Sequence, residues 1–240
     1  MIPCLYTDNV SFTVPGNNTP ILSSANLKIM PEEFIVLLGH NGSGKSTLIK
    51  LLSGEVNPTT GYVYMDQLLI SSLDFQKRAK DIITLTQRPE ERLFSNLTLK
   101  ENIILWESRF QKKERLEAAD IFSLTGREEK FANLQNQPVK TLSGGEKQIF
   151  LLALVLAHPP RILFLDEHTS SLDPKSSEDV MLMTAEAVAK HKITTIMVTH
   201  KLEDAINYGS HIVILKEGHI VSDKQKPHDL SIKTLKEMME

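Results

Sequence analysis

The chain has 240 residues, of which 41% are hydrophobic and 24% charged, with a formal net charge of −3. This ordinary globular composition is sufficient for one substantial core and at most two small domains. The small charge, without a long cluster of basic residues, argues against nucleic acid or an anionic membrane surface as a partner.

A membrane span and a disulfide are both excluded by simple counts. The longest apolar run, Ile149–Ala157, has nine residues, whereas a membrane-spanning helix needs about 20. Cys4 is the only cysteine, so no internal disulfide can form and a reducing cytosol is the expected compartment. We therefore expect a cytoplasmic protein that reaches a membrane only through a partner.

The first 87 residues are expected to be rich in strands. Asn9–Val14 alternates polar and apolar residues, and Phe34–Leu38 is a continuous apolar run that is typical of a sheet covered on both faces. A helix is predicted over 46–52, a connector over 54–61 and a buried strand over 81–86.

The remaining chain divides into a helical segment and a second α/β segment. Residues 88–158 lack strand signals and contain charged helical stretches such as 111–124. Beyond them the pattern predicts strands at 161–166, 193–198, 211–215 and 220–221, a hairpin turn at 216–219, and helices at 176–190, 202–208 and 229–239. Alternating strands and helices indicate an α/β fold with a parallel sheet and ligands at its carboxyl edge.

A glycine-rich segment between the strand ending at Leu38 and the next helix matches a phosphate-binding loop. Its glycines let successive N–H groups converge on an anion, and the helix N-terminus adds partial positive charge. Lys45 is expected to reach the terminal phosphates and the Ser46 hydroxyl to coordinate Mg²⁺. The residues of this predicted nucleotide site are Gly39, His40, Asn41, Gly42, Ser43, Gly44, Lys45, Ser46 and Thr47.

Polar residues follow three other apolar strands. Asp166 and Glu167 come after Ile162–Leu165, with Asp166 expected to hold Mg²⁺ and Glu167 to polarise a water aimed at the γ-phosphate. His200 follows another strand and can sense the γ-phosphate, and Gln87 can reach Mg²⁺ and the attacking water. In isolation, Gln87 or His200 would more simply be a solvated or capping side chain.

The heptapeptide Leu142–Gln148, Leu-Ser-Gly-Gly-Glu-Lys-Gln, completes a pattern that resembles the ATP-binding cassette (ABC) ATPases. The family's seven elements occur in order: the phosphate loop, Gln87, this signature, the strand ending at Asp166, Glu167, the segment 171–173 and His200. The resemblance implies a P-loop NTPase (RecA-like) core with an N-terminal antiparallel β subdomain and an inserted α-helical subdomain. The corresponding boundaries are 1–87, 88–158 and 159–240.

The resemblance also implies how the site works. Two copies would form a head-to-tail dimer, in which Ser143, Gly144, Gly145 and Glu146 of one copy bind the ATP held by the other. The implied metal ligands are Ser46, Gln87 and Asp166, and the implied catalytic residues are Glu167, His200 and Lys45. Val14 stands where the family usually has the aromatic residue that stacks on adenine, and Phe12 and Tyr6 are the alternative aromatic residues for that role.

Separate membrane permease subunits are the implied partners, docked through Gln87–Leu105 with Phe94 in the groove. Asn136–Thr141 lacks the pattern often seen in exporters, which favours an importer with an extracytoplasmic solute-binding protein. Two alternatives stay open: a soluble ABC ATPase with no transporter, as in iron–sulfur cluster assembly, and a module that binds ATP without turnover.

Overall fold

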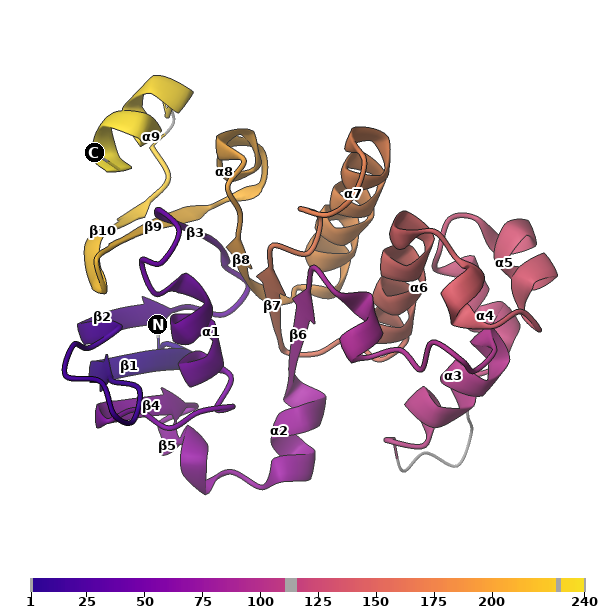
Figure 1. The fold of residues 1–240 in the computed structure, drawn as a ribbon, viewed down its shortest axis with the longest axis horizontal. Coiled ribbons are helices and arrows are strands. Elements are labelled where there is room, and N and C mark those ends of the chain that lie inside the picture. Colours follow the sequence, from indigo (N-terminus) through magenta and orange to yellow (C-terminus); the bar gives the residue numbers. More distant parts are fainter. Residues whose placement is uncertain (1, 111–115, 228–229, 240) are drawn as a thin grey trace. The chain divides into compact units, whose positions relative to one another are not determined.

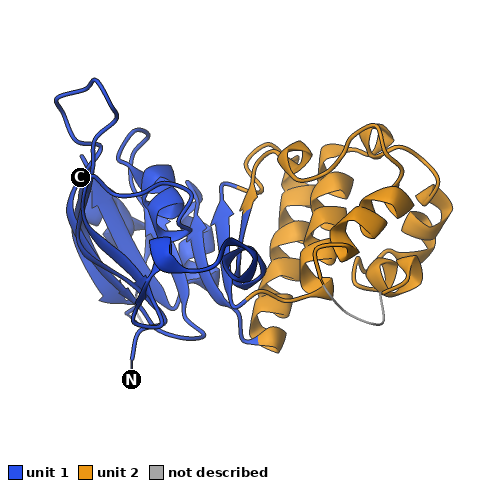
Figure 2. Cartoon of the chain, turned by 90° about the horizontal axis from the view of Figure 1, so that it is seen from below, with its two compact units in different colours: residues 1–84, 161–167, 192–240 blue, residues 85–160, 168–191 orange. Residues whose placement is uncertain are grey.

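A computed structural model describes residues 2–110, 116–227 and 230–239. The chain forms two compact units, coloured separately in Figure 2. Unit 1 comprises residues 1–84, 161–167 and 192–240, and unit 2 comprises residues 85–160 and 168–191. Within the described ranges, no helix is both long and apolar enough to cross a bilayer.

Unit 1 contains an antiparallel sheet with the order β2-β1-β4-β5. Its strands are β1 (Leu5–Phe12), β2 (Leu22–Ile29), β4 (Thr60–Met65) and β5 (Leu68–Leu69). Between Thr7 and Val10 the register of β1 against β2 shifts, and Asn9 has a φ of +48°. The predicted strand Asn9–Val14 is confirmed only over Asn9–Phe12: β1 starts earlier, at Leu5, and ends at Phe12, and the alternation that suggested the strand crosses this bulge.

The second sheet has the order β10-β9-β3-β8-β7-β6. Its strands are β3 (Phe34–Leu38), β6 (Ile82–Thr86), β7 (Ile162–Asp166), β8 (Thr194–Val198), β9 (His211–Lys216) and β10 (His219–Gln225). Parallel pairs join β7 to β8, β8 to β3 and β3 to β9, as predicted. The carboxyl ends of β3, β7 and β8 therefore share one edge, where the predicted site residues begin.

Short helices complete unit 1 (Figure 1): α1 (Lys45–Leu52), α2 (Phe75–Asp81), α8 (Leu202–Tyr208) and α9 (Ile232–Met239), with the 3₁₀ turn Ile70–Ser72. The helix α1 packs against β1 and β7. It contributes Leu48 and Leu52 to a core that also contains Ile35 and Phe164. This buried cluster holds the start of α1 fixed against both sheets.

Unit 2 is built from helices. They are α3 (Leu99–Glu107), α4 (Ala118–Ser123), α5 (Glu128–Leu134), α6 (Gly144–Ala157) and α7 (Pro174–His191), with 3₁₀ turns at Pro89–Glu91 and Val139–Thr141. Phe131 stacks between Phe122 and Phe150 in the core, with ring centroids 6.3 and 6.1 Å away. The apolar run Ile149–Ala157 lies on the buried helix α6.

Some predicted helices begin later than expected or lie partly outside the described residues. The prediction over 111–124 includes residues 111–115, which the structure does not describe, and the observed α4 starts at Ala118. The prediction over 229–239 includes Asp229, also outside the described residues, and α9 starts at Ile232. The division into 1–87, 88–158 and 159–240 remains a prediction beside the two observed units.

Candidate functional site

The loop between β3 and α1 has a backbone that other residues could not adopt easily. Gly39 has a φ of +151°, and a Cβ there would lie 2.2 Å from the carbonyl oxygen of Leu215. Gly44 caps α1 with a φ of +105°, and its Cβ would lie 2.9 Å from Leu22. The hydroxyl of Ser43 is buried in this loop and hydrogen-bonds to no described residue. The loop therefore has a glycine-dependent backbone of the kind that binds anions through N–H groups, and the buried Ser43 hydroxyl is available as a further donor.

Lys45 lies at the first position of α1 with its side chain buried. Its Nζ donates to the carbonyl oxygens of Gly39 and His40, at 2.8 and 2.9 Å. Burial lowers the pKa of Lys45, and the nearby carboxylates of Glu167 and Asp166 oppose this shift. The ammonium group is thus held inside the loop, where an anionic ligand would meet it.

Ser46 and Asp166 meet across unit 1, although 120 residues separate them. The Ser46 hydroxyl donates to Oδ1 of Asp166 at 3.2 Å. Burial raises the pKa of Asp166, the bond from Ser46 opposes this, and the charge of Glu167 adds to it. A hydroxyl and a half-buried carboxylate side by side are hard oxygen donors of the kind that Mg²⁺ prefers.

Glu167 lies just beyond β7 and has a different partner from Asp166. Its φ is +52°, and its N–H donates to the carbonyl oxygen of Val198 at 3.1 Å. Its Oε1 lies 2.8 Å from Nε2 of His200. The two acids do have different partners, as predicted, but a left-handed backbone at Glu167 separates them rather than strand alternation.

A cavity of about 690 Å³ opens over this loop. Its lining residues are Thr19, Pro20, Ile21, Asn41, Gly42, Gly44, Lys45, Ser46, Thr47, Glu167, Glu217 and Gly218. Gly218, in the turn between β9 and β10, donates its N–H to the carbonyl of Ser43 at 3.1 Å and accepts from the N–H of Ser23 at 2.9 Å. The hairpin turn thereby joins the loop to the start of β2.

Tyr6 and Phe12, the alternative residues for stacking on adenine, are not among the described residues that line this cavity. Tyr6 stacks on Tyr64 with ring centroids 4.7 Å apart, and Phe12 packs against the core of unit 1. Pro20 and Ile21 form the apolar wall instead. No sequence signal distinguished these two residues, because they lie in an irregular segment before a strand.

Gln87 lies in unit 2 and is held by the segment that follows Glu167. Its Oε1 accepts a hydrogen bond from the Ser170 hydroxyl at 3.1 Å, and its backbone carbonyl accepts one from Ser171 at 3.2 Å. Sequence reasoning did not anticipate this pair of serines, because nothing local links residues 83 positions apart. Whether Gln87 contributes to a metal site remains a prediction.

The signature segment starts α6 with a reciprocal cap. Ser143 accepts from the N–H of Glu146, and Glu146 Oε2 accepts from the N–H of Ser143 at 2.7 Å. Glu146 also pairs with Lys130. Ser143 and Gly144 are exposed, whereas Gly145 is buried. A Cβ at Gly145 would lie 2.7 Å from the hydroxyl oxygen of Ser176. The helix N-terminus is therefore rigid and presents Ser143 and Gly144 to the surface.

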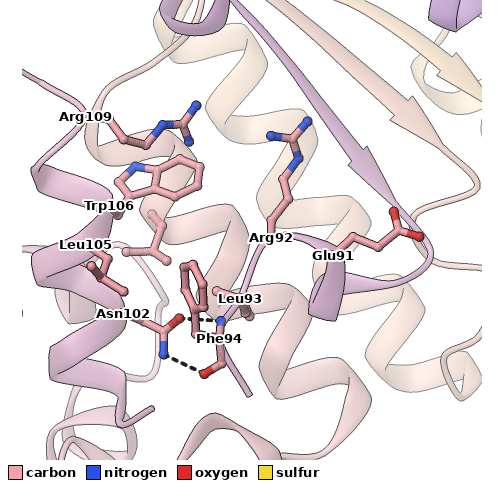
Figure 3. A pocket seen from close by; sticks show the side chains of 9 residues that line it. Glu91, Arg92, Leu93, Phe94, Asn102, Leu105, Trp106 and Arg109 are labelled. Carbon is pink, nitrogen blue, oxygen red and sulfur yellow. Dashed lines mark hydrogen bonds between the residues drawn. The ribbon is translucent and has the colours of Figure 1, made fainter. Parts of the chain in front are cut away.

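A second cavity, of about 190 Å³, lies within unit 2 (Figure 3). It is lined by Glu91, Arg92, Leu93, Phe94, Asn102, Leu105, Trp106, Arg109 and Leu154. The buried Asn102 accepts from the N–H of Phe94 at 2.8 Å and donates to its carbonyl at 3.1 Å. Phe94 is nevertheless 59% exposed. Hydrogen bonds thus hold its backbone, while its apolar ring is accessible beside this cavity, which we call the groove.

The residues of unit 1 fit a nucleoside triphosphate with a divalent cation. The cradle of N–H groups, the buried Lys45 ammonium and the spare Ser43 hydroxyl would complement phosphate oxygens. Ser46 and Asp166 would complement the cation. The structure thus brings Lys45, Ser46, Asp166, Glu167 and His200 together within one unit, whereas Gln87 and Ser143–Glu146 belong to the other.

Known proteins share this fold and sequence. Residues 22–170 match the protein-family model described as "ABC transporter". A "Tyrosine transport ATP-binding protein" of Clostridioides difficile is 31% identical, with 98% of each chain covered. An "Energy-coupling factor transporter ATP-binding protein EcfA2" of Enterococcus faecalis is 35% identical over 88% of this chain and 75% of its own length.

Solved structures agree with these relatives. A dimeric ATP-binding cassette in a post-hydrolysis state with ADP and phosphate has a TM-score of 0.78 and 28% identity, covering 92% of this chain and 98% of its own. The cbiO1 protein of Clostridium perfringens, part of the ABC transporter complex cbiONQ, also has a TM-score of 0.78, with 25% identity over 94% of this chain and 89% of its own. The predicted fold class, a P-loop NTPase, is confirmed.

Proposed function

The chain belongs to the ABC transporter family of ATPases, and from this premise we propose that it drives solute import through separate membrane subunits. It is an ATP-binding transporter subunit that hydrolyses ATP. The single observation that carries the proposed chemistry is the set of contacts around the phosphate loop. There Lys45, the Ser46–Asp166 pair and the Glu167–His200 pair all belong to unit 1.

Each of these groups takes one part of the reaction. The loop N–H groups and Lys45 bind the phosphates. Ser46, Asp166 and Gln87 would hold Mg²⁺, which would neutralise charge on the phosphate oxygens. Glu167 orients and polarises the attacking water, and His200 holds the Glu167 carboxylate in position and contacts the γ-phosphate.

The proposed active form is a head-to-tail dimer. In it Ser143, Gly144, Gly145 and Glu146 of one copy would bind the ATP carried by the other. The rigid cap of α6 supports this proposal, because it leaves Ser143 and Gly144 exposed at a helix N-terminus. ATP would then favour the closed dimer through contacts that hydrolysis removes.

The groove beside Phe94 is the proposed docking site for a membrane permease, within the segment Gln87–Leu105. The exposed Phe94 ring and the 40% exposed Leu105 offer apolar contacts to an incoming helix. The chain would therefore act on the cytoplasmic face of the membrane, held there by its partner. An extracytoplasmic solute-binding protein would complete an importer.

Transport in vesicles tests this function. The chain is reconstituted with the membrane subunit that copurifies with it, and solute uptake is measured together with phosphate release. Tyrosine is the first solute to try, because one relative is named for its transport. Phe94→Ala should reduce uptake far more than phosphate release by the chain alone. Equal loss of both, or no copurifying membrane protein, would contradict the proposal.

A further inference from the structure

The cavity over the phosphate loop is lined by more residues than the proposed chemistry uses. Besides the loop itself, its lining includes the apolar Pro20 and Ile21, and Glu217 and Gly218 of the turn between β9 and β10. Pro20 and Glu217 are exposed, and Ile21 is half-buried. None of these residues has a part in binding the phosphates or in the hydrolysis described above. They are therefore candidates for holding the nucleoside half of the substrate.

The turn at Glu217 and Gly218 contacts both the phosphate loop and the apolar wall. The N–H of Gly218 donates to the carbonyl of Ser43 in the loop at 3.1 Å. A Cβ at Gly218 would lie 2.6 Å from the carbonyl oxygen of Ile21, so the turn packs directly on the wall. In any nucleotide the ribose joins the phosphates to the base. A turn that contacts both the loop and the wall is thus next to the position expected for the ribose.

The carboxylate of Glu217 is available to a ligand, because it has no hydrogen-bond or ion-pair partner among the described residues. An ionised carboxylate can only accept hydrogen bonds, and phosphate oxygens repel it. The donors that a nucleoside triphosphate offers are the hydroxyls of its ribose and the N–H groups of its base. Two neighbouring ribose hydroxyls suit the two oxygens of one carboxylate, and an acidic residue binds the ribose 2′-hydroxyl in dinucleotide-binding folds.

The backbone of Glu217 is an independent indication of a role for its side chain. Glu217 and Gly218 have φ values of +47° and +80° and form the two-residue turn between the strand ending at Lys216 and the strand starting at His219. Such turns favour asparagine, aspartate or glycine at the first position, whereas glutamate is disfavoured there. The chain thus has a carboxylate where stability alone would favour another residue, as expected when a side chain serves a ligand.

We propose that Glu217 binds the ribose hydroxyls of the nucleotide and makes the chain selective for ribonucleotides over 2′-deoxyribonucleotides. Pro20 and Ile21 pack against the base, in place of the aromatic residue that is usual in the family. Their side chains carry no hydrogen-bonding group, so this packing discriminates only weakly between adenine and guanine. The inference rests on the proposed function, since it assumes that the phosphates of the nucleotide occupy the loop around Lys45.

Affinities of the full chain for ATP and 2′-deoxy-ATP test the inference. Wild type should bind ATP about three- to tenfold more tightly, the ratio expected for one hydrogen bond. Glu217→Gly should bind ATP more weakly by a similar factor and bind both nucleotides equally, while its thermal unfolding temperature is unchanged or higher because glycine suits the turn. The matched control is Glu32→Gly, at an exposed glutamate with a φ of +67° that does not line the cavity, and it should keep the wild-type ratio.

Lys45→Ala separates a failure of this inference from a failure of the proposed function. If Lys45→Ala weakens the binding of ATP, but wild type binds ATP and 2′-deoxy-ATP equally, the phosphate site stands and the ribose contact is wrong. If Lys45→Ala binds ATP like wild type, the phosphates do not occupy this loop and the proposed function fails as well.

Purine riboside triphosphate distinguishes a ribose contact from a base contact, because it has the ribose of ATP but lacks the 6-amino group of adenine. It should bind wild type about three- to tenfold more tightly than Glu217→Gly, as ATP does. If it binds the two proteins equally, while ATP still favours wild type, the carboxylate contacts the base and the proposal is overturned.

Discussion

The Nε2 atom of His200 lies 2.8 Å from Oε1 of Glu167, across the ends of two adjacent parallel strands. Glu167 makes this contact from a left-handed backbone (φ +52°), while the neighbouring Asp166 accepts from Ser46. The histidine therefore fixes the carboxylate that we assign to the attacking water.

Glu167→Gln should slow phosphate release at least about 100-fold, because an amide cannot accept the proton of the water. ATP binding should persist, since Lys45 and the loop are unchanged, and dimers should accumulate with ATP. Phosphate release and gel filtration measure these effects. Glu203→Gln, at another acid on the nearby helix α8, is the control. Hydrolysis at the wild-type rate by Glu167→Gln would refute its assigned role.

Lys45→Ala should weaken ATP binding by roughly ten- to a hundredfold, the loss expected for about 1.5–3 kcal/mol of charge-assisted hydrogen bonding. Lys50→Ala, at the exposed end of the same helix, provides the comparison. Fluorescent nucleotide titration gives both affinities. Equal affinities for the two variants would mean that Lys45 serves only the loop carbonyls that it contacts in this structure.

Gly145→Ala should lower the free energy of unfolding by about 1–3 kcal/mol, because its Cβ would overlap Ser176. Gly144→Ala should not, since the nearest atom would be a Leu172 methyl carbon at 3.4 Å and alanine favours helix. Ser176→Gly should restore part of the loss in the Gly145→Ala background. Urea unfolding measures each variant, and equal effects at the two glycines would contradict the packing argument.

The buried His211 should make stability depend on pH. Burial alone would lower its pKa, but the hydrogen bond and charge of Asp223, together with Glu33, raise it overall. A raised folded pKa stabilises the protein fully below the unfolded value of about 6.5 and loses that contribution as pH rises through the folded value.

The test is urea unfolding at a series of pH values from about 6 upward. His211→Gln should remove the fall in stability above about pH 6.5. The exposed His219→Gln on β10 should keep it. If wild type and His211→Gln have the same pH profile, the network around His211 does not contribute in this way.

The sequence predicted the phosphate loop well, because a buried strand, glycines and a helix start lie within a dozen residues of one another. The acids after β7 and His200 after β8 were likewise readable, since parallel strands bring their carboxyl ends to one edge. A sequence pattern is sufficient to predict such site residues when they directly follow a strand that the pattern itself identifies.

Long-range contacts were not readable. No strand was predicted over β4 (Thr60–Met65), whose pairing depends on β1 about fifty residues earlier. The bond from Ser170 to Gln87 and the φ of Glu167 are likewise set by tertiary contacts. The cavity within unit 2 is lined by both Arg92 and Arg109, which no periodicity connects.

In the proposed dimer each ATP is bound by two copies of the chain, and mixing two inactive variants distinguishes this arrangement from a site formed by one copy. Glu167→Gln disables the catalytic side and Ser143→Arg the signature side. Each variant should be inactive alone. Their mixture should recover about a quarter of wild-type phosphate release, because half of randomly paired dimers would carry one intact site out of two. A mixture as inactive as its components would contradict the shared site.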